Sequence, residues 1–196
     1  MDADVYKAPD AEIMTESAEG LEFYVVSPKK FLILQISTMG MYSIYWFFKH
    51  WKQYKLKHNE GMWPIARAIF YIFFTHSLFT AFYVRAKERY KDLVWSPEGM
   101  ATIFVVLTII ENISNRMATK EIGSPITDVL GLIFFPVITW ILYKAQLVAN
   151  LACDMPEGEV NSNITGANIF WIMLGAVIWL LVILGLAIAF GFDPFY

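Results

Sequence analysis

Two ionisable side chains, His76 and Glu111, interrupt apolar stretches that are long enough to lie in a lipid bilayer. A charged side chain at the bilayer centre costs roughly 2.5 kcal/mol or more, so each needs a partner, a water-filled cavity or a function. If the two stretches pack as antiparallel helices, a rise of ~1.5 Å per residue places the two side chains at similar depths. The pair could then pass protons or coordinate a cation, and Asn112 could extend that path.

The alternative interpretation of Glu111 is structural. The carboxyl group could stay protonated or hydrogen-bond to a neighbouring helix, because buried polar residues often hold transmembrane helices together. The substitution Glu111→Gln separates the two hypotheses. A transport function should be lost, whereas a structural role should tolerate this near-isosteric change.

The rest of the sequence contains few groups that could form an active site. A single cysteine, Cys153, excludes an intramolecular disulfide and a multi-cysteine metal site. The sequence has no HExxH, GxSxG or glycine-rich phosphate motif. His50, His58 and Glu60 could serve a lipid-modifying enzyme, but such a set in a soluble-facing loop more often forms a solvated surface. We therefore expect a non-enzymatic protein with no cofactor and no metal site.

The composition identifies the environment of these residues. Hydrophobic residues make up 57% of the chain and the mean hydropathy is +0.48, against roughly 45–50% apolar residues in soluble domains. Seven acidic residues and one lysine occupy positions 1–22, which predicts a flexible acidic tail. Positions 23–196 are predicted to form a single helical membrane domain. No extended basic and aromatic surface of the kind that binds nucleic acid is present.

Five apolar segments are expected to form the membrane domain. The predicted fold is an all-α, polytopic α-helical membrane protein with 4–5 membrane segments in one bundle. The first segment contains several polar residues and a glycine, so it could be a kinked crossing or a re-entrant hairpin. The fourth contains Pro136 and continues past the interface to about position 151. The segments cover about 31–48, 64–84, 100–117, 126–143 and 166–190.

The distribution of lysine and arginine bears on the topology, because short cytoplasmic loops are enriched in both. If all five segments cross, seven basic residues fall on each side. If the first segment returns to its own side, the count becomes nine against five, and both termini are then cytoplasmic. We favour that second arrangement.

A stretch after the first segment combines lysines with aromatic residues. This composition is typical of an interfacial helix on an anionic membrane surface, and an ordinary membrane anchor is favoured over a lipid-specific site. The predicted lipid-interface residues are Lys49, Trp51, Lys52, Tyr54 and Lys55.

The last segment contains small residues at a spacing of four, which lets helix backbones approach closely. These residues are Gly185, Ala187, Ala189 and Gly191. They predict a packing face, used either within the bundle, which we favour, or by a homo-oligomer.

Three short motifs stand near the two ends of the chain: Gly40-Met-Tyr-Ser-Ile-Tyr-Trp-Phe, Met62-Trp-Pro-Ile-Ala-Arg67, and Asn163-Ile-Thr-Gly-Ala-Asn before the apolar last segment. In these motifs the chain resembles an uncharacterised family of small bacterial inner-membrane proteins. The resemblance implies a multi-pass protein of the bacterial inner (cytoplasmic) membrane. It implies no activity and no functional residues.

Together these observations predict a non-enzymatic integral membrane protein, such as an accessory or envelope-associated component. Its expected partners are the lipid bilayer and either a further membrane protein or a second copy of the chain. The alternative is a small transporter or channel that uses Glu111 and His76, favoured by the interrupted first segment.

Overall fold

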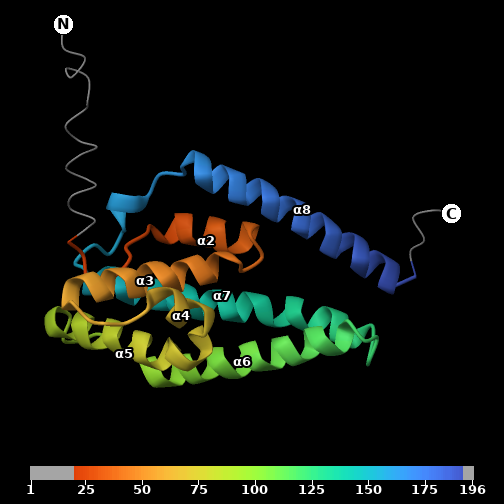
Figure 1. Ribbon diagram of the computed structural model, residues 1–196, viewed down its shortest axis with the longest axis horizontal. Helices are drawn as coiled ribbons and strands as arrows, with labels where there is room; N and C mark the ends of the chain where they lie inside the picture. The colour runs from red at the N-terminus through yellow and green to blue at the C-terminus, as the bar shows by residue number, and fades with distance from the viewer. Residues whose placement is uncertain (1–19, 192–196) are drawn as a thin grey trace, which may run out of the picture.

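The structure is a computed structural model that describes residues 20–191. This part of the chain contains seven α-helices and one short 3-10 helix (Figure 1), which confirms the all-α class. The helices are α2 (Pro28–Ser37), α3 (Tyr42–His58), α4 (Pro64–Ile69), α5 (Tyr71–Arg89), α6 (Pro97–Ala118), α7 (Ile126–Ala152) and α8 (Gly166–Ala189), with the 3-10 helix η1 (Glu159–Asn161) before α8. Residues 1–19, most of the predicted acidic tail, lie outside the described residues.

Three helices, α6, α7 and α8, are long and apolar enough to cross a membrane. They have 22, 27 and 24 residues, against the ~20 that a crossing needs. They correspond to the predicted third, fourth and fifth segments, and α7 continues without interruption through Pro136. Local signals set two of their starts: Ser96 caps α6, and Thr165 forms a capping box at the start of α8.

The first predicted segment, 31–48, is not one helix but a hairpin of α2 and α3, so it does not cross as a single helix. The turn between them passes through Met39 and Gly40, whose φ angles are +51° and +84°. Thr38 ties the two helices together, because its hydroxyl donates to Leu34 O at 2.7 Å and accepts from the backbone N–H of Tyr42 at 3.0 Å. The first segment therefore has the backbone of a hairpin, and its re-entrance into a membrane stays a prediction.

The second predicted segment, 64–84, is also interrupted, so its prediction as one crossing helix is wrong. Phe70 has φ −97° and ψ 35°, which ends α4, and α5 starts at the next residue. The short α4 packs beside α3, and the guanidinium of Arg67 in α4 lies 4.3 Å from the ring centroid of Trp51 in α3. The chain then turns back along α5 instead of continuing in one direction (Figure 1).

The core consists mainly of aromatic rings from α3, α5, α6 and the extended residues before α2. Its largest fully buried side chains are Trp46, Trp51, Phe23, Phe31, Phe47, Phe79, Phe82 and Phe104. Edge-to-face pairs are common within it, for example Phe23 on Phe82 at 4.8 Å. This core occupies the half of the molecule that holds α2 to α5, while α6, α7 and α8 extend beyond it (Figure 1).

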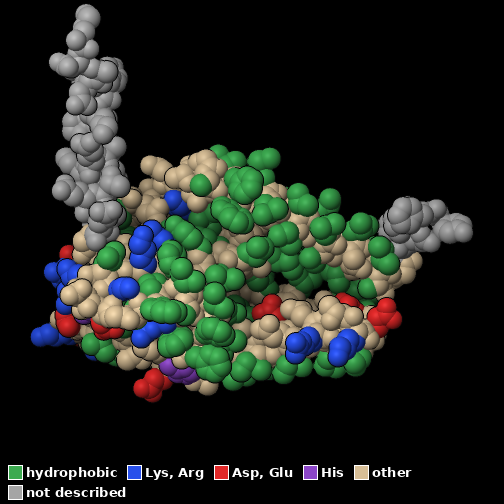
Figure 2. Space-filling model, in the orientation of Figure 1, with side chains coloured by type: hydrophobic (Ala, Val, Ile, Leu, Met, Phe, Trp, Pro, Cys, Tyr) green, Lys and Arg blue, Asp and Glu red, His purple; other side chains and the backbone are tan. Residues whose placement is uncertain are grey.

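Charged side chains gather at the two ends of the molecule, with an apolar face between them (Figure 2). We call the end where α3, α5 and α7 finish and α8 starts the basic end. The turn from α6 to α7, between Ala118 and Ile126, is the far end. Among residues 20–191, only Arg116 and Lys120 are basic residues at the far end, and the others lie on the half of the molecule toward the basic end.

Candidate functional site

The structure does not bring the predicted pair His76 and Glu111 together. His76 is exposed on α5, and its Nε2 lies 3.1 Å from the hydroxyl of Thr102 on α6. Glu111 lies nine residues beyond Thr102, or about 13 Å further along the helix. Its carboxylate is directed toward α7, where a Cβ added at Gly131 would lie 3.8 Å from Glu111 Oε1.

The loop between α5 and α6 accounts for this separation. The chain runs back along α5 before α6 begins, so that Trp95 lies against Phe79 and Tyr83 at ring distances of 5.6 and 6.4 Å. α6 therefore starts beside the middle of α5 instead of beside its end. The prediction that His76 and Glu111 lie at similar depths assumed that the two helices meet at their ends, so it did not include this offset.

Asn112 does not extend a polar path either. Its side-chain amide donates to Thr108 O at 2.8 Å, one turn back in the same helix. The bond is local and requires no partner from another element. A continuous polar path from His76 through Glu111 and Asn112 is therefore not found among residues 20–191.

The predicted lipid-interface residues belong to α3, one face of which is buried in the aromatic core. Trp51 is only 1% exposed, because Arg67 from α4 covers its ring, so its assignment to the interface is wrong. Tyr54 stacks on Phe23 at 5.8 Å. Lys52 is exposed and Lys55 is half-buried near the basic end.

Of the four predicted packing residues of α8, the two glycines make no close contact in the described chain. A Cβ added at Gly185 or Gly191 would meet nothing within 4 Å, and Ala189 is exposed whereas Ala187 is half-buried. The close approach occurs instead at Gly175, where a Cβ would lie 2.0 Å from the carbonyl oxygen of Ser37. The two glycines therefore do not serve as close-packing positions within the described chain, and the use of the four small residues as a packing face stays a prediction.

An extended segment before α2, residues 22–27, passes through the core, and sequence reasoning missed it. We call it the strap. Side chains from α3 and α7 bind its backbone: Tyr24 N–H donates to His50 Nδ1 at 3.2 Å, and Gln146 Nε2 donates to Tyr24 O at 3.0 Å. Asn150 donates to Val26 O at 3.0 Å and accepts from Val26 N–H at 3.4 Å. These bonds satisfy an extended backbone that has no neighbouring strand.

Gln146 is the centre of this network. Its Oε1 accepts from Trp46 Nε1 and lies 3.4 Å from His50 Nε2, and its Nε2 also donates to Asn150 Oδ1 at 2.7 Å. Because His50 Nδ1 accepts from Tyr24, the ring proton belongs on Nε2, where it faces Gln146. Burial lowers the pKa of His50 to about 3, although the bond to Gln146 opposes part of that change. The imidazole is therefore a neutral structural group.

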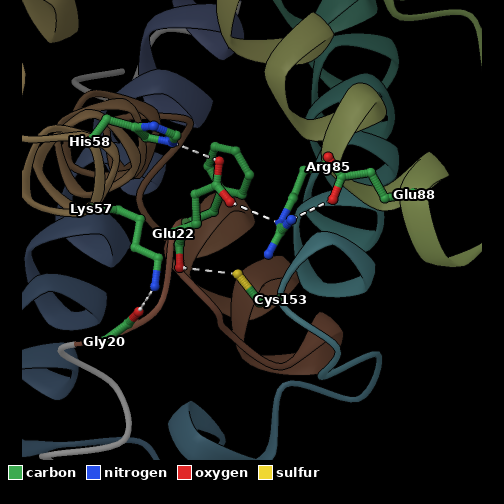
Figure 3. A network of polar contacts seen from close by, with 8 residues as sticks. Gly20, Glu22, Lys57, His58, Arg85, Glu88 and Cys153 are labelled. Carbon is green, nitrogen blue, oxygen red and sulfur yellow. Dashed lines mark hydrogen bonds and ion pairs between the residues drawn. The ribbon is translucent and has the colours of Figure 1, made fainter.

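A second cluster fixes the start of the strap at the basic end (Figure 3). The Glu22 carboxylate lies 2.9 Å from His58 Nε2 and 3.0 Å from Arg85 Nε, so it joins α3 to α5. The Cys153 thiol donates to the carbonyl of Phe23 at 3.6 Å, and burial raises its pKa to about 11. The thiol is therefore a poor nucleophile.

An open groove of about 860 Å³ lies between α2, α3, α4 and the start of α8. Most of its polar lining residues, such as Lys30, Lys49 and Asn161, lie toward the basic end, and apolar residues line the groove as far as the hairpin turn. No known family model, curated protein or solved structure matches the chain. The function must therefore be inferred from this geometry alone.

Part of this site has a signal in the sequence. Gln146 and Asn150 are four residues apart in an apolar helix, so they share one face and predict a polar contact there. Phe23-Tyr24-Val25-Val26 is an aromatic and β-branched run that favours extended backbone. Neither pattern identifies the partner, because the two segments are separated by more than a hundred residues.

Proposed function

We propose that this chain is a non-enzymatic integral membrane protein that crosses the bilayer three times, through α6, α7 and α8. The two shorter units, the α2–α3 hairpin and the α4–α5 pair, enter from the basic end and return to it. The basic end faces the cytoplasm, and residues 20 and 191 lie on opposite sides of the membrane.

One observation carries this proposal: the separation of the basic residues along the molecule. All but Arg116 and Lys120 among the described lysines and arginines lie toward one end, which is the asymmetry expected of a cytoplasmic face. A fourth crossing through the second segment, which loop charges alone favoured, would put the basic residues before and after that segment on opposite sides of the membrane. The interruption of the second segment at Phe70 places Arg85 beside Glu22 and argues against a crossing there.

The exposed surface of α8 gives independent support. Only 6% of the most apolar stretch of α8 is buried inside the molecule. Large apolar side chains on this helix, such as Phe170, Leu180 and Ile183, are 60–67% exposed. An apolar face of this size is typical of a membrane interaction site. The exposed surface of α8 is therefore suited to contact with lipid.

An accessory role suits the remaining features. The buried polar groups of the strap network are occupied in holding the fold, and no group of three metal-ligating side chains occurs among residues 20–191. The alternative of a small transporter depended on His76 and Glu111 sharing a site, and the structure separates them. We therefore propose a structural or accessory component, with the bacterial inner membrane as the location that the family resemblance implies.

The topology is testable with single cysteines in a Cys153→Ser background. Cysteines at Glu60, Asp92 and Glu157 should share one accessibility to an impermeant maleimide in intact cells, and a cysteine at Glu121 should show the opposite accessibility. The comparison of Glu60 with Asp92 is decisive. Opposite labelling of these two positions would mean that the second segment crosses, and the three-crossing topology would be wrong.

A further inference from the structure

The groove has a polarity gradient along the direction of the proposed crossings. Its polar end is formed by Lys30, Lys49, Asn161 and Thr165, close to the first residues of α2 and α8. Gln53 and Asn168 also line the groove on this side. The rest is lined mainly by apolar side chains from all four helices and reaches the hairpin turn at Met41, beside Thr38, whose hydroxyl donates to Leu34 O. These apolar residues are Leu34, Met41, Ile44, Phe48, Ile65, Ile69 and Trp171.

Lys30 supplies a buried positive charge to the polar end. The residue is 5% exposed, and its ammonium donates to Asn161 Oδ1 and to Asn163 O, both at 2.6 Å. Both acceptors are neutral oxygens, and no carboxylate pairs with Lys30 among residues 20–191. An ammonium can donate three hydrogen bonds, so one donor remains after these two. Burial lowers the pKa of Lys30, which is the effect that a bound anion would offset.

The other charged residue that lines the groove is also a lysine. The Lys49 ammonium lies 5.5 Å from the ring centroid of Tyr24 and 6.0 Å from that of Tyr45. No aspartate or glutamate of the described chain lines the cavity. The helices α2 and α8 both start at this end, so their dipoles add to the positive potential.

An anion alone would leave the apolar part of the groove unfilled. The cavity volume of about 860 Å³ falls within the roughly 300–1,000 Å³ of ligand pockets. A ligand that matches both parts carries a negative group at the depth of Lys30 and an apolar chain that extends toward the middle of the bilayer. Membrane phospholipids have this form.

We propose that the groove binds one anionic phospholipid, with its phosphate at Lys30 and an acyl chain along α3 and α4. The polarity gradient selects a lipid over a free anion, and the positive charge of Lys30 selects an anionic lipid over a zwitterionic one. The site rests on the proposed membrane location, because its polar end must lie at the headgroup level.

The test uses the full-length protein in detergent micelles and native mass spectrometry. Phosphatidylglycerol and phosphatidylcholine with identical acyl chains are titrated in parallel. We expect tighter retention of phosphatidylglycerol by the unsubstituted protein. Lys30→Met should weaken that retention about tenfold or more, the size expected for a lost charge-assisted hydrogen bond. Lys29→Met, an equal charge change at the exposed neighbouring residue, should change it less than about twofold.

A second pair of variants tests the apolar part of the groove. Ala167→Trp places a large ring in the lining of the cavity and should reduce phosphatidylglycerol retention. Ile169→Trp adds a ring on the same helix outside that lining and should not. Circular dichroism and size-exclusion profiles establish that each variant is folded, and the comparison of Ala167→Trp with Ile169→Trp carries the test if Lys30→Met unfolds.

Three outcomes would overturn the proposal: equal retention of the two lipids, equal effects of the Lys30 and Lys29 substitutions in folded protein, or no effect of Ala167→Trp. The membrane proposal fails separately. Cysteine labelling in cells measures the topology without reference to lipid affinity, so a correct topology with equal lipid retention would reject the lipid site alone.

Discussion

The buried imidazole of His50 predicts that acid destabilises the fold at mild pH. His50 is 0% exposed, and the rings of Tyr24, Trp46 and Phe82 surround it at centroid distances of 4.3–5.9 Å. Its Nδ1 accepts the Tyr24 N–H, so a proton added there would oppose an existing donor. The folded protein therefore binds this proton only near pH 3, whereas the unfolded chain binds it near pH 6.5.

The sign of the effect follows from linkage. Because the folded-state pKa is depressed, the unfolded state binds more protons between these two values, and stability falls as the pH falls. The stabilisation from neutral His50 is complete above about pH 6.5 and is lost progressively toward pH 3. Between pH 7 and pH 5 the expected loss is about 2 kcal/mol, from ~1.4 kcal/mol per pH unit below the unfolded pKa.

The assay is chemical unfolding in mild detergent at pH 7 and pH 5, followed by tryptophan fluorescence. His50→Asn should be less stable than the unsubstituted protein at pH 7 because it leaves a cavity. Between pH 7 and pH 5, His50→Asn should lose less unfolding free energy than the unsubstituted protein does, and the difference should be most of the 2 kcal/mol. His76→Asn, a change at an exposed histidine, should keep the original acid response. An unchanged loss in His50→Asn would refute the assignment of the acid response to His50.

Two further substitutions test other parts of the fold. Gly175→Leu should separate α8 from the hairpin and destabilise the protein by about 2 kcal/mol or more, because the new Cβ would lie 2.0 Å from the Ser37 carbonyl oxygen. The control is Gly185→Leu, which meets open space and should be near neutral in the same unfolding assay. Gln146→Met should cost about 3–5 kcal/mol, because it leaves a buried indole N–H and a buried backbone carbonyl unpaired. Asn112→Leu removes a hydrogen bond within one helix and should cost less than about 1 kcal/mol of unfolding free energy. Equal losses in Gln146→Met and Asn112→Leu would contradict the central role of the network.

Several local features of the fold could be read from the sequence. The apolar runs that form α6, α7 and α8 are recognisable because hydropathy and length are properties of consecutive residues. Polar residues at Gln35, Thr38 and Ser43 indicated a break in the first segment, and the structure uses all three at the hairpin, with Gln35 bound to Ser43 at 3.0 Å.

The candidate site was less predictable. The break at Phe70 has no glycine or polar residue to indicate it, and it arises where α4 packs against α3. In the sequence, Lys30 looks like an ordinary loop charge. Its burial could not be foreseen, because it depends on Asn161, which is 131 residues away. Distances along the chain carry no information about such contacts.

The sequence by itself determined that the chain is helical, that it carries long apolar helices and where those helices start, since caps and hydropathy act over a few residues. Only the tertiary structure decided which groups meet. It placed the strap between α3 and α7, separated His76 from Glu111 and brought Lys30 to the mouth of an apolar groove. The physical reason is that burial and hydrogen bonding of polar groups depend on surfaces from distant segments, which the packing of the helices alone brings together.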